Sequence, residues 1–255
     1  YPIELFNAGY IKLVDYMGDN YEPAGSARVS TGKGKLGPEK DKKLITRLAS
    51  DQHTSTFESI ELHFEVKLPI FVLREWDRHR TIRINETELY CELEEICTHD
   101  NDSRCFRSQN EMSARYVDMP NEYYIPPTFR LAKQSKANAQ GEAGLFDEWH
   151  QKYFQEKIAQ SINSSRQVYD SLINEGVERG LARCVLPFSQ YTVVRLKADM
   201  LYWSKFLRLR LDSAAQYEIR QYSIALAHLI NALYPELYPI LEENMIHQGV
   251  LPRTE

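Results

Sequence analysis

The alternating stretch at 59–69 constrains the fold more than any other part of the chain. Apolar and polar residues alternate along it. The apolar residues are Ile60, Leu62, Phe64, Val66 and Leu68, and the polar ones are Glu61, His63, Glu65 and Lys67. A period of two places the apolar side chains on one face of a strand and the polar ones on the other. The pattern predicts a strand with one face in a hydrophobic core and the other in water.

Helical segments are predicted on both sides of this strand. Proline is favoured in the first turn of a helix, and Pro38 and Pro69 begin two such segments, at about 38–52 and 69–80. A long helix is predicted over 145–173, because apolar residues recur there at helical spacing without an internal proline. We interpret six of its side chains as core: Phe146, Trp149, Phe154, Ile158, Ile162 and Leu172.

The remaining elements complete an α+β pattern. Residues 11–18 and 191–196 have the composition of strands, a short helix ends at Pro187, and two helices close the chain. Ser213 and Gln216 have the spacing of a capping box at the start of the last helix. No repeat or linker divides the chain, so we predict a single α+β domain over 1–255, with a small, mainly antiparallel sheet packed against several helices.

The charge balance excludes a general affinity for polyanions. There are 31 Lys and Arg residues against 36 Asp and Glu, so no broad basic field is available to hold a nucleic acid, and anionic ligands need local clusters. No apolar run approaches the roughly 20 residues of a membrane helix, and the start does not look like a signal peptide. Four Cys residues in this length indicate a reducing compartment. We therefore expect a soluble, cytoplasmic protein without membrane or nucleic-acid partners.

Two local clusters could bind anions. Arg78, His79 and Arg80 are consecutive at the end of a predicted helix, where guanidinium groups could bind phosphate oxygens in pairs. Glu111, Ser113 and Arg115 alternate, so in an extended segment they project to one side and fit a ribose and its phosphate. The residues alone leave a second interpretation open for both clusters, a solvated helix end and a surface loop. The Gly-rich loop at 30–38 lacks the order of a P-loop, and we do not expect it to cradle phosphate.

The ordered set of motifs resembles the flavin-dependent thymidylate synthase family. The similarity extends from about residue 27 to 227 through "ARVS", "HTSTFE", "RHR", "NEMSARY", "YIP", "ARCVLP" and "LRLRLDSAAQYEIRQY". The resemblance implies an α+β homotetramer with active sites shared between subunits. It also implies FAD as cofactor and methylation of dUMP to dTMP, with methylenetetrahydrofolate as carbon donor and NADPH as reductant.

The resemblance also assigns roles to individual residues. The implied catalytic residues are Arg210, which would polarise the uracil ring, and His53, at the folate and flavin face, with Glu58 in the same motif. The implied FAD-binding residues are Ser55, Arg78, His79, Arg80 and Glu111. The implied dUMP-binding residues are Arg78, Glu111, Ser113, Ala114, Arg115, Arg183 and Arg210. No covalent enzyme nucleophile is implied, and Cys184 has no evident base partner in the sequence.

The chain departs from the family pattern at several places. A segment at about 86–110 is inserted, so that either Glu86 or Glu111 is the site glutamate, and we favour Glu111 because it keeps Ser113 and Arg115 in phase. The spacing of Cys91, Cys97, His99 and Cys105 in the insert is not usual for zinc, and no metal is expected. Four further positions differ from the family and concern ligand affinity: Glu75, Leu201, Lys205 and Ala214.

The chemistry explains why arginine is required at position 210. Carbon 5 of uracil is a poor nucleophile until negative charge develops on the ring, and a fixed guanidinium beside the ring stabilises that charge. The alternative function is a non-catalytic nucleotide- or RNA-binding protein that retains the basic clusters. The polar face of the strand at 59–69 disfavours it, because this face offers His63 as its only ring on which a base could stack.

Overall fold

The fold is built around one antiparallel sheet. The computed structural model describes residues 1–79, 108–136 and 142–247. The five strands lie in the order β1 (Ile3–Leu5), β2 (Gly9–Met17), β3 (Glu61–Pro69), β7 (Tyr191–Asp199) and β4 (Ser108–Glu111), and every neighbouring pair is antiparallel. The alternating stretch is therefore a strand, as predicted, and it lies at the centre of the sheet. The α+β prediction is confirmed. Residues 108–110, at the end of the predicted insertion, pair with β7.

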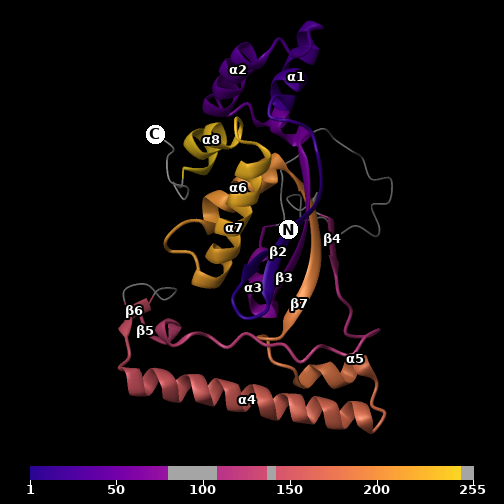
Figure 1. The fold of residues 1–255 in the computed structure, drawn as a ribbon, viewed down its shortest axis with the longest axis vertical. Coiled ribbons are helices and arrows are strands. Elements are labelled where there is room, and N and C mark those ends of the chain that lie inside the picture. Colours follow the sequence, from indigo (N-terminus) through magenta and orange to yellow (C-terminus); the bar gives the residue numbers. More distant parts are fainter. Residues whose placement is uncertain (80–107, 137–141, 248–255) are drawn as a thin grey trace, which may run out of the picture.

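Helices cover one face of this sheet. Contacts join α3 (Ile70–Trp76) to β3, α6 (Met200–Arg210) to β7, and α7 (Tyr217–Leu233) to β1 and β2 (Figure 1). The apolar side chains of β3 are fully buried there, among the rings of Trp76, Trp203 and Phe206. The short helix α8 (Tyr238–Leu241) and a π-helical turn (Glu242–Ile246) close this core.

The opposite face of the sheet is polar. Glu65 accepts hydrogen bonds from Arg195 Nε at 3.0 Å and from the Tyr10 hydroxyl at 3.1 Å. Lys67 pairs with Glu122 at 2.7 Å, and Lys197 pairs with Glu61. The Glu65–Arg195 and Glu61–Lys197 pairs thus neutralise charge between the neighbouring strands β3 and β7. The polar character of this face is as predicted.

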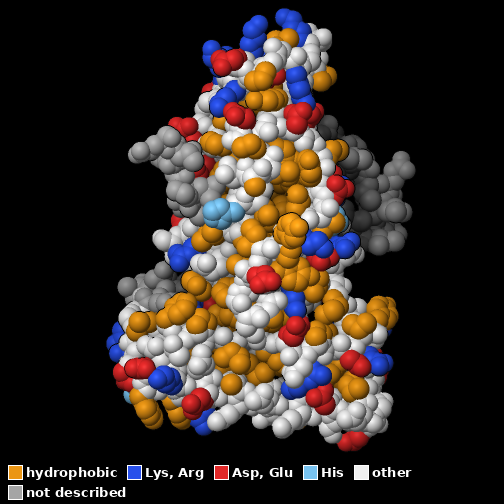
Figure 2. All heavy atoms as spheres, viewed as in Figure 1, with side chains coloured by type: hydrophobic (Ala, Val, Ile, Leu, Met, Phe, Trp, Pro, Cys, Tyr) orange, Lys and Arg blue, Asp and Glu red, His pale blue; other side chains and the backbone are white. Residues whose placement is uncertain are grey.

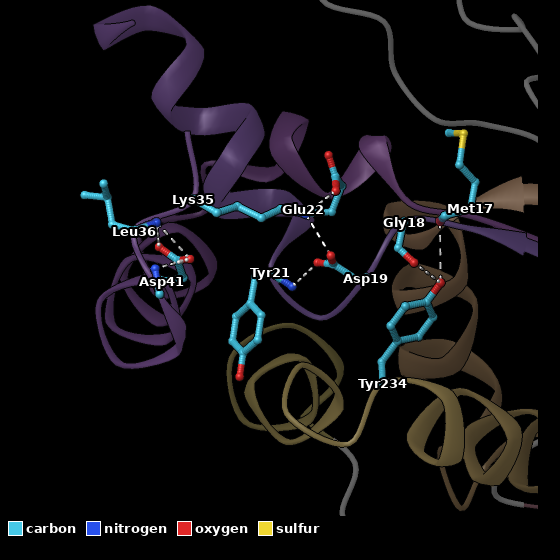
Figure 3. A network of polar contacts seen from close by, with 10 residues as sticks. Met17, Gly18, Asp19, Tyr21, Glu22, Lys35, Leu36, Asp41 and Tyr234 are labelled. Atoms are coloured by element: carbon cyan, nitrogen blue, oxygen red, sulfur yellow. Dashed lines mark hydrogen bonds and ion pairs between the residues drawn. The ribbon is translucent and has the colours of Figure 1, made fainter. Parts of the chain in front are cut away.

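A layer formed by α1 (Glu22–Arg28), α2 (Pro38–Ser50) and the 3₁₀ helix Thr54–Ser59 caps one end of the sheet. Charged side chains of both signs gather at this end (Figure 2). Asp41 is buried, and its carboxylate accepts a hydrogen bond from the backbone N–H of Leu36 at 3.0 Å (Figure 3). It also accepts from the N–H of Gly37 at 3.2 Å and from the guanidinium of Arg28. These two N–H groups are therefore committed to Asp41, which agrees with the expectation that the loop does not cradle phosphate.

A second group of elements lies at the other end of the molecule. It contains α4 (Glu148–Asn174), α5 (Arg179–Ala182), the 3₁₀ turns Thr128–Arg130 and Arg183–Val185, and the hairpin of β5 (Ala132–Gln134) and β6 (Glu142–Leu145) (Figure 1). Ala114, Met119, Tyr169 and Ala182 form a hydrophobic cluster of their own here. The buried ion pair of Arg130 with Glu218, at 2.9 Å, joins this region to α7.

The prediction of a long helix is confirmed, but the prediction that its aromatic residues are core is wrong. In α4 only Ile162 and Tyr169 are buried, while Trp149 is 66% exposed and stacks on Tyr153 at a centroid distance of 5.2 Å. The reason is position: α4 lies along the margin of the fold, so only one narrow face meets other elements (Figure 1). Helical periodicity in the sequence does not reveal whether the apolar face is covered within the same chain.

The predicted capping box is also wrong. Helix α7 begins at Tyr217 with Gln216 as its N-cap, and Ser213 lies in the preceding turn. That turn is closed by Asp212, whose Oδ1 accepts the backbone N–H of Ala214 at 2.8 Å. An aspartate that bonds its own local backbone competes with a serine cap one residue later.

Within the described ranges, no helix is both long and apolar enough to cross a membrane, and no group of three or more His, Cys, Asp and Glu side chains could hold a metal ion. The Cys and His residues of the predicted insertion, and Glu86, lie outside the described residues.

Candidate functional site

The C-terminal ends of α3 and α6 meet and bring together residues more than 130 positions apart. Arg210, the last residue of α6, donates from Nε to His79 Nε2 at 2.6 Å and from Nη2 to the backbone oxygen of Glu75 at 3.4 Å. The Glu75 carboxylate lies 3.6 Å from Arg210 Nη2 and 3.5 Å from Arg78 Nε. Three residues of the predicted site, Arg78, His79 and Arg210, thus form one cluster around Glu75. The third residue of the basic triplet, Arg80, lies outside the described residues.

The environment of Arg210 fixes both its charge and its direction. Its side chain is 18% exposed, and burial lowers the pKa of the guanidinium, an effect that the Glu75 carboxylate opposes. Arginine stays protonated despite such a shift. Because Nε and Nη2 are both held, the planar group has a set orientation, whereas Arg78 is 71% exposed and paired with Glu75 at the surface. The oriented cation can stabilise negative charge on one part of an anionic ligand. The exposed cation beside it can bind a second anionic group of the same ligand.

A second cluster lies at the far end of the fold. β4 ends at Glu111, and the chain then turns, with the N–H of Tyr116 donating to the oxygen of Ser113 at 3.1 Å. The extended arrangement that would project Glu111, Ser113 and Arg115 to one side is therefore not found, and the segment is a surface turn, the second interpretation that the sequence left open. The turn instead packs Ala114 against Ala182, next to Arg183.

This second cluster has unsatisfied positive charge. Arg115 and Arg183 are exposed, and among the described residues neither guanidinium has a hydrogen bond or an ion pair. The backbone N–H of Arg115 donates to Ser113 Oγ at 3.3 Å. Unpaired guanidinium groups and a hydroxyl are the chemical groups that bind a phosphate.

Glu111 is not part of either arginine cluster in the described structure. Its Oε1 accepts a hydrogen bond from the hydroxyl of Thr192 on β7 at 2.9 Å. The carboxylate is thereby directed onto the sheet rather than towards Arg115.

The remaining predicted residues lie together at the opposite end of α6. His53 precedes the 3₁₀ helix Thr54–Ser59, and both His53 and Ser55 are exposed. Asp199, which the sequence analysis did not single out, is the N-cap of α6 and accepts the N–H of Tyr202 at 2.8 Å. Burial and the nearby Glu58 raise the pKa of Asp199 to about 6, while Lys205 opposes the rise. The signal that could have found it is an acidic residue directly before a helical pattern.

The four positions that differ from the family pattern lie in different environments. Leu201 is buried in the main core at 2% exposure, so its side chain packs and does not face a ligand. Lys205 and Ala214 are exposed. Glu75, which the sequence analysis connected only with ligand affinity, pairs with both Arg78 and Arg210.

Comparison with known proteins decides what this arrangement belongs to. The family model described as "Thymidylate synthase complementing protein" matches residues 12–236. A flavin-dependent thymidylate synthase from Kosmotoga olearia is 37% identical over 253 residues, which are 99% of this chain and 98% of that protein. The chain belongs to the flavin-dependent thymidylate synthase family.

Other relatives agree. A flavin-dependent thymidylate synthase from Thermus thermophilus is 35% identical over 99% of this chain and 83% of its own length. The crystal structure of a UMP/dUMP methylase, PolB from Streptomyces cacaoi with bound 5-Br dUMP, has a TM-score of 0.76 and 25% identity, covering 96% of this chain and 99% of that one. The family assignment made from the sequence motifs is confirmed, and the chain is an enzyme of the flavin-dependent thymidylate synthase class, a methyltransferase.

The residues present fit FAD, the cofactor of this family. A dinucleotide needs cations for its phosphates and hydrogen-bonding groups for its other parts. Arg78 offers an exposed guanidinium and Ser55 an exposed hydroxyl, and His79, whose Nε2 accepts a hydrogen bond from Arg210, follows Arg78 in the chain. The carboxylate nearest to Arg78, that of Glu75, is shared with Arg210, which leaves positive charge for an anionic ligand.

Proposed function

We propose that this enzyme methylates dUMP to dTMP, with FAD as bound cofactor, methylenetetrahydrofolate as carbon donor and NADPH as reductant. The observation that carries the proposal is the oriented guanidinium of Arg210 beside the exposed Arg78 at the meeting ends of α3 and α6. The printed description of the PolB structure, a UMP/dUMP methylase with a bound dUMP analogue, supports dUMP as substrate.

Each cluster has a separate task in this proposal. Arg210 stabilises the negative charge that develops on the uracil ring when C5 attacks the one-carbon unit. Ser113, Arg115 and Arg183 hold the phosphate, and the backbone of Ala114 borders it. Arg78 binds at the junction of nucleotide and cofactor, together with His79, Arg80, Ser55 and Glu111, while His53 lies at the folate face. When bound, FAD supplies the electrons that reduce the transferred carbon to a methyl group.

We further propose a homotetramer whose sites are shared between subunits. The separation of the two arginine clusters supports it, because Arg210 ends α6, whose apolar residues lie in the main core, whereas Arg115 follows Ala114 of the second hydrophobic cluster. Exposed aromatic residues such as Trp149 are also typical of surfaces that are covered in an assembly. The domain organisation, one domain over 1–255 with an insertion at about 86–110, remains part of this proposal.

The proposal is tested on the purified full-length protein. We expect a yellow protein with a flavin absorption spectrum, a mass near that of four chains of 29.8 kDa, and dTMP formation that requires methylenetetrahydrofolate and NADPH. A colourless preparation that also fails to bind added FAD would favour the alternative function, a non-catalytic nucleotide-binding protein. A yellow protein that forms no dTMP from dUMP would contradict the proposed substrate.

Glu75→Gln is expected to tighten dUMP binding. The carboxylate now neutralises Arg210 and Arg78 at 3.6 and 3.5 Å, and the neutral amide of similar size would leave both guanidinium groups available to the nucleotide. We expect the Kd for dUMP to fall by a factor of about 3 to 10, since a partly exposed ion pair contributes roughly 1 kcal/mol. Equilibrium titration with dUMP measures it. A Kd that rises would mean that Glu75 positions the arginines rather than competing for them.

A further inference from the structure

The turn at 113–118, which carries Ser113 and Arg115, is flanked on both sides by backbone groups that are hydrogen-bonded to other elements. Before it, the backbone N–H of Met112 donates to the oxygen of Val193 on β7 at 2.9 Å. After it, the backbone of Met119 is held by α4 on both sides. The N–H of Met119 donates to the hydroxyl of Tyr169 at 3.2 Å, and its oxygen accepts from Arg166 Nη1 at 2.7 Å.

The two groups that hold Met119 are themselves immobilised. Tyr169 is 1% exposed, and its ring lies 5.1 Å from the guanidinium carbon of Arg166. Arg166 is 18% exposed and pairs with Asp170 one turn along α4, with Nε to oxygen at 3.0 Å and Nη2 to oxygen at 2.8 Å. Because a buried phenol and a paired guanidinium have few alternative rotamers, they form a rigid clamp.

Other restraints on the turn are weaker. The Arg179 and Asp118 side chains pair at 2.6 Å but are about half exposed, and exposed ion pairs contribute little. The hydrogen bond from Tyr116 to Ser113 closes the turn but, being internal to it, does not fix the position of the turn relative to the rest of the fold. The apolar contact of Ala114 and Met119 with Ala182 is non-directional. The clamp on Met119 therefore sets where the turn lies relative to α5 and Arg183.

We propose that Tyr169 and Arg166 are positioning residues for phosphate binding, acting through the backbone of Met119 on Ser113 and Arg115. The inference rests on the proposed function, because it assigns the phosphate of dUMP to this turn. A guanidinium on a loosely held turn must be ordered when the ligand binds, and that ordering weakens affinity. The clamp removes this cost before dUMP arrives, so it affects binding and not the chemical step.

The test is Tyr169→Phe, which removes one oxygen and leaves the Met119 N–H buried without its partner. Calorimetric titration of the flavin-loaded enzyme is expected to give a Kd for dUMP about tenfold higher than in the parent, the equivalent of roughly 1.4 kcal/mol. The affinity for deoxyuridine, which has no phosphate, should stay at the parent value. Single-turnover methyl transfer at saturating dUMP should also keep its parent rate. A change that merely loosened the fold would weaken both ligands alike.

Tyr238→Phe is the matched control. It removes the same hydroxyl from another buried tyrosine, in the main core, where that oxygen has no hydrogen-bond partner among the described residues. We expect it to leave the Kd for dUMP unchanged. Arg166→Met tests the clamp from the carbonyl side of Met119 and should produce the same selective loss of dUMP, which keeps the inference testable if Tyr169→Phe does not fold.

A double-mutant cycle with Arg115→Ala separates positioning from a direct effect. If Tyr169 acts through the turn, its removal should cost less dUMP affinity once Arg115 has been truncated. Full additivity, or a Tyr169→Phe enzyme that binds dUMP as tightly as the parent, would overturn the inference while leaving the proposed function intact. A parent protein that does not bind dUMP at all would contradict the proposed function, and this inference would fall with it.

Discussion

Arg210→Lys is expected to slow methyl transfer by a factor of about 100 to 1,000, the usual effect of losing one charge-stabilising donor. Lysine keeps the positive charge but loses the planar fork. The parent fork is held in one orientation by His79 Nε2 at 2.6 Å and by the backbone oxygen of Glu75, and a flexible ammonium cannot reproduce both contacts. If Arg210 stabilises charge that develops on the ring, the rate must fall by more than dUMP affinity does.

The measurement is single-turnover methyl transfer from pre-reduced enzyme at saturating dUMP, with flavin reduction by NADPH followed separately. Arg208→Lys is the matched control, because Arg208 lies on the same helix, is exposed, and has no hydrogen bond or ion pair within the part of the chain that is described. Arg115→Lys should instead mainly weaken apparent dUMP affinity, since the proposed function assigns Arg115 to the phosphate, which is remote from the reacting carbon.

Equal losses in the Arg210→Lys and Arg115→Lys enzymes would mean that Arg210 only binds the nucleotide. An Arg210→Lys enzyme that transfers the methyl group at the parent rate when saturated would lead to the same conclusion. A rate loss that disappears after photochemical reduction of the flavin would place the defect in electron delivery rather than in methyl transfer.

Local patterns in the sequence were sufficient for most helices and for the three long strands of the sheet, but not for the short edge strands β1 and β4. The alternation from Ile60 to Leu68 determines which side chains face the core, because a strand has a fixed period of two and its apolar face was then found fully buried. The residues of the first arginine cluster could also be named, but through family motifs rather than through physical reasoning. Composition and spacing alone indicated Arg78 as a possible anion-binding residue, with a solvated helix end as the alternative, and they did not single out Arg210.

What local patterns could not provide was contact between distant segments. The role of Glu75 depends on the C-terminal ends of α3 and α6 meeting, and the clamp of Tyr169 on Met119 joins residues 50 positions apart. Neither contact produces a repeating pattern of residues from which it could be predicted. The exposed Trp149 is a related case, because helical spacing identifies an apolar face without saying what covers it.

Asp41→Asn is expected to lower the free energy of unfolding by about 3 kcal/mol, towards the lower end of the range for breaking a buried ion pair. The Asp41 side chain is 1% exposed and that of Arg28 is 11% exposed, so the change leaves a nearly buried guanidinium without its counter-ion. The amide oxygen of asparagine can still accept the N–H of Leu36, which limits the loss. Urea denaturation at one fixed protein concentration measures it. Asp51→Asn is the control, because Asp51 is 48% exposed and its pair with Arg47 at 3.3 Å lies at the surface.

The pH dependence of the difference in unfolding free energy shows whether Asp41→Asn acts by removing a charge or by disturbing the packing. Burial alone would raise the pKa of Asp41, but the hydrogen bonds from the Leu36 backbone and from Arg28 outweigh burial and hold the pKa below its ordinary value. A carboxyl whose pKa is depressed by folding stabilises the protein above its unfolded pKa of about 3.9, and that stabilisation is lost as the pH falls through the folded value. The difference between parent and Asp41→Asn should therefore be constant from about pH 6 to 8 and shrink below about pH 4. A difference that stays the same down to the acid limit of folding would mean that asparagine disturbs the packing of the 32–37 loop rather than the charge of Asp41.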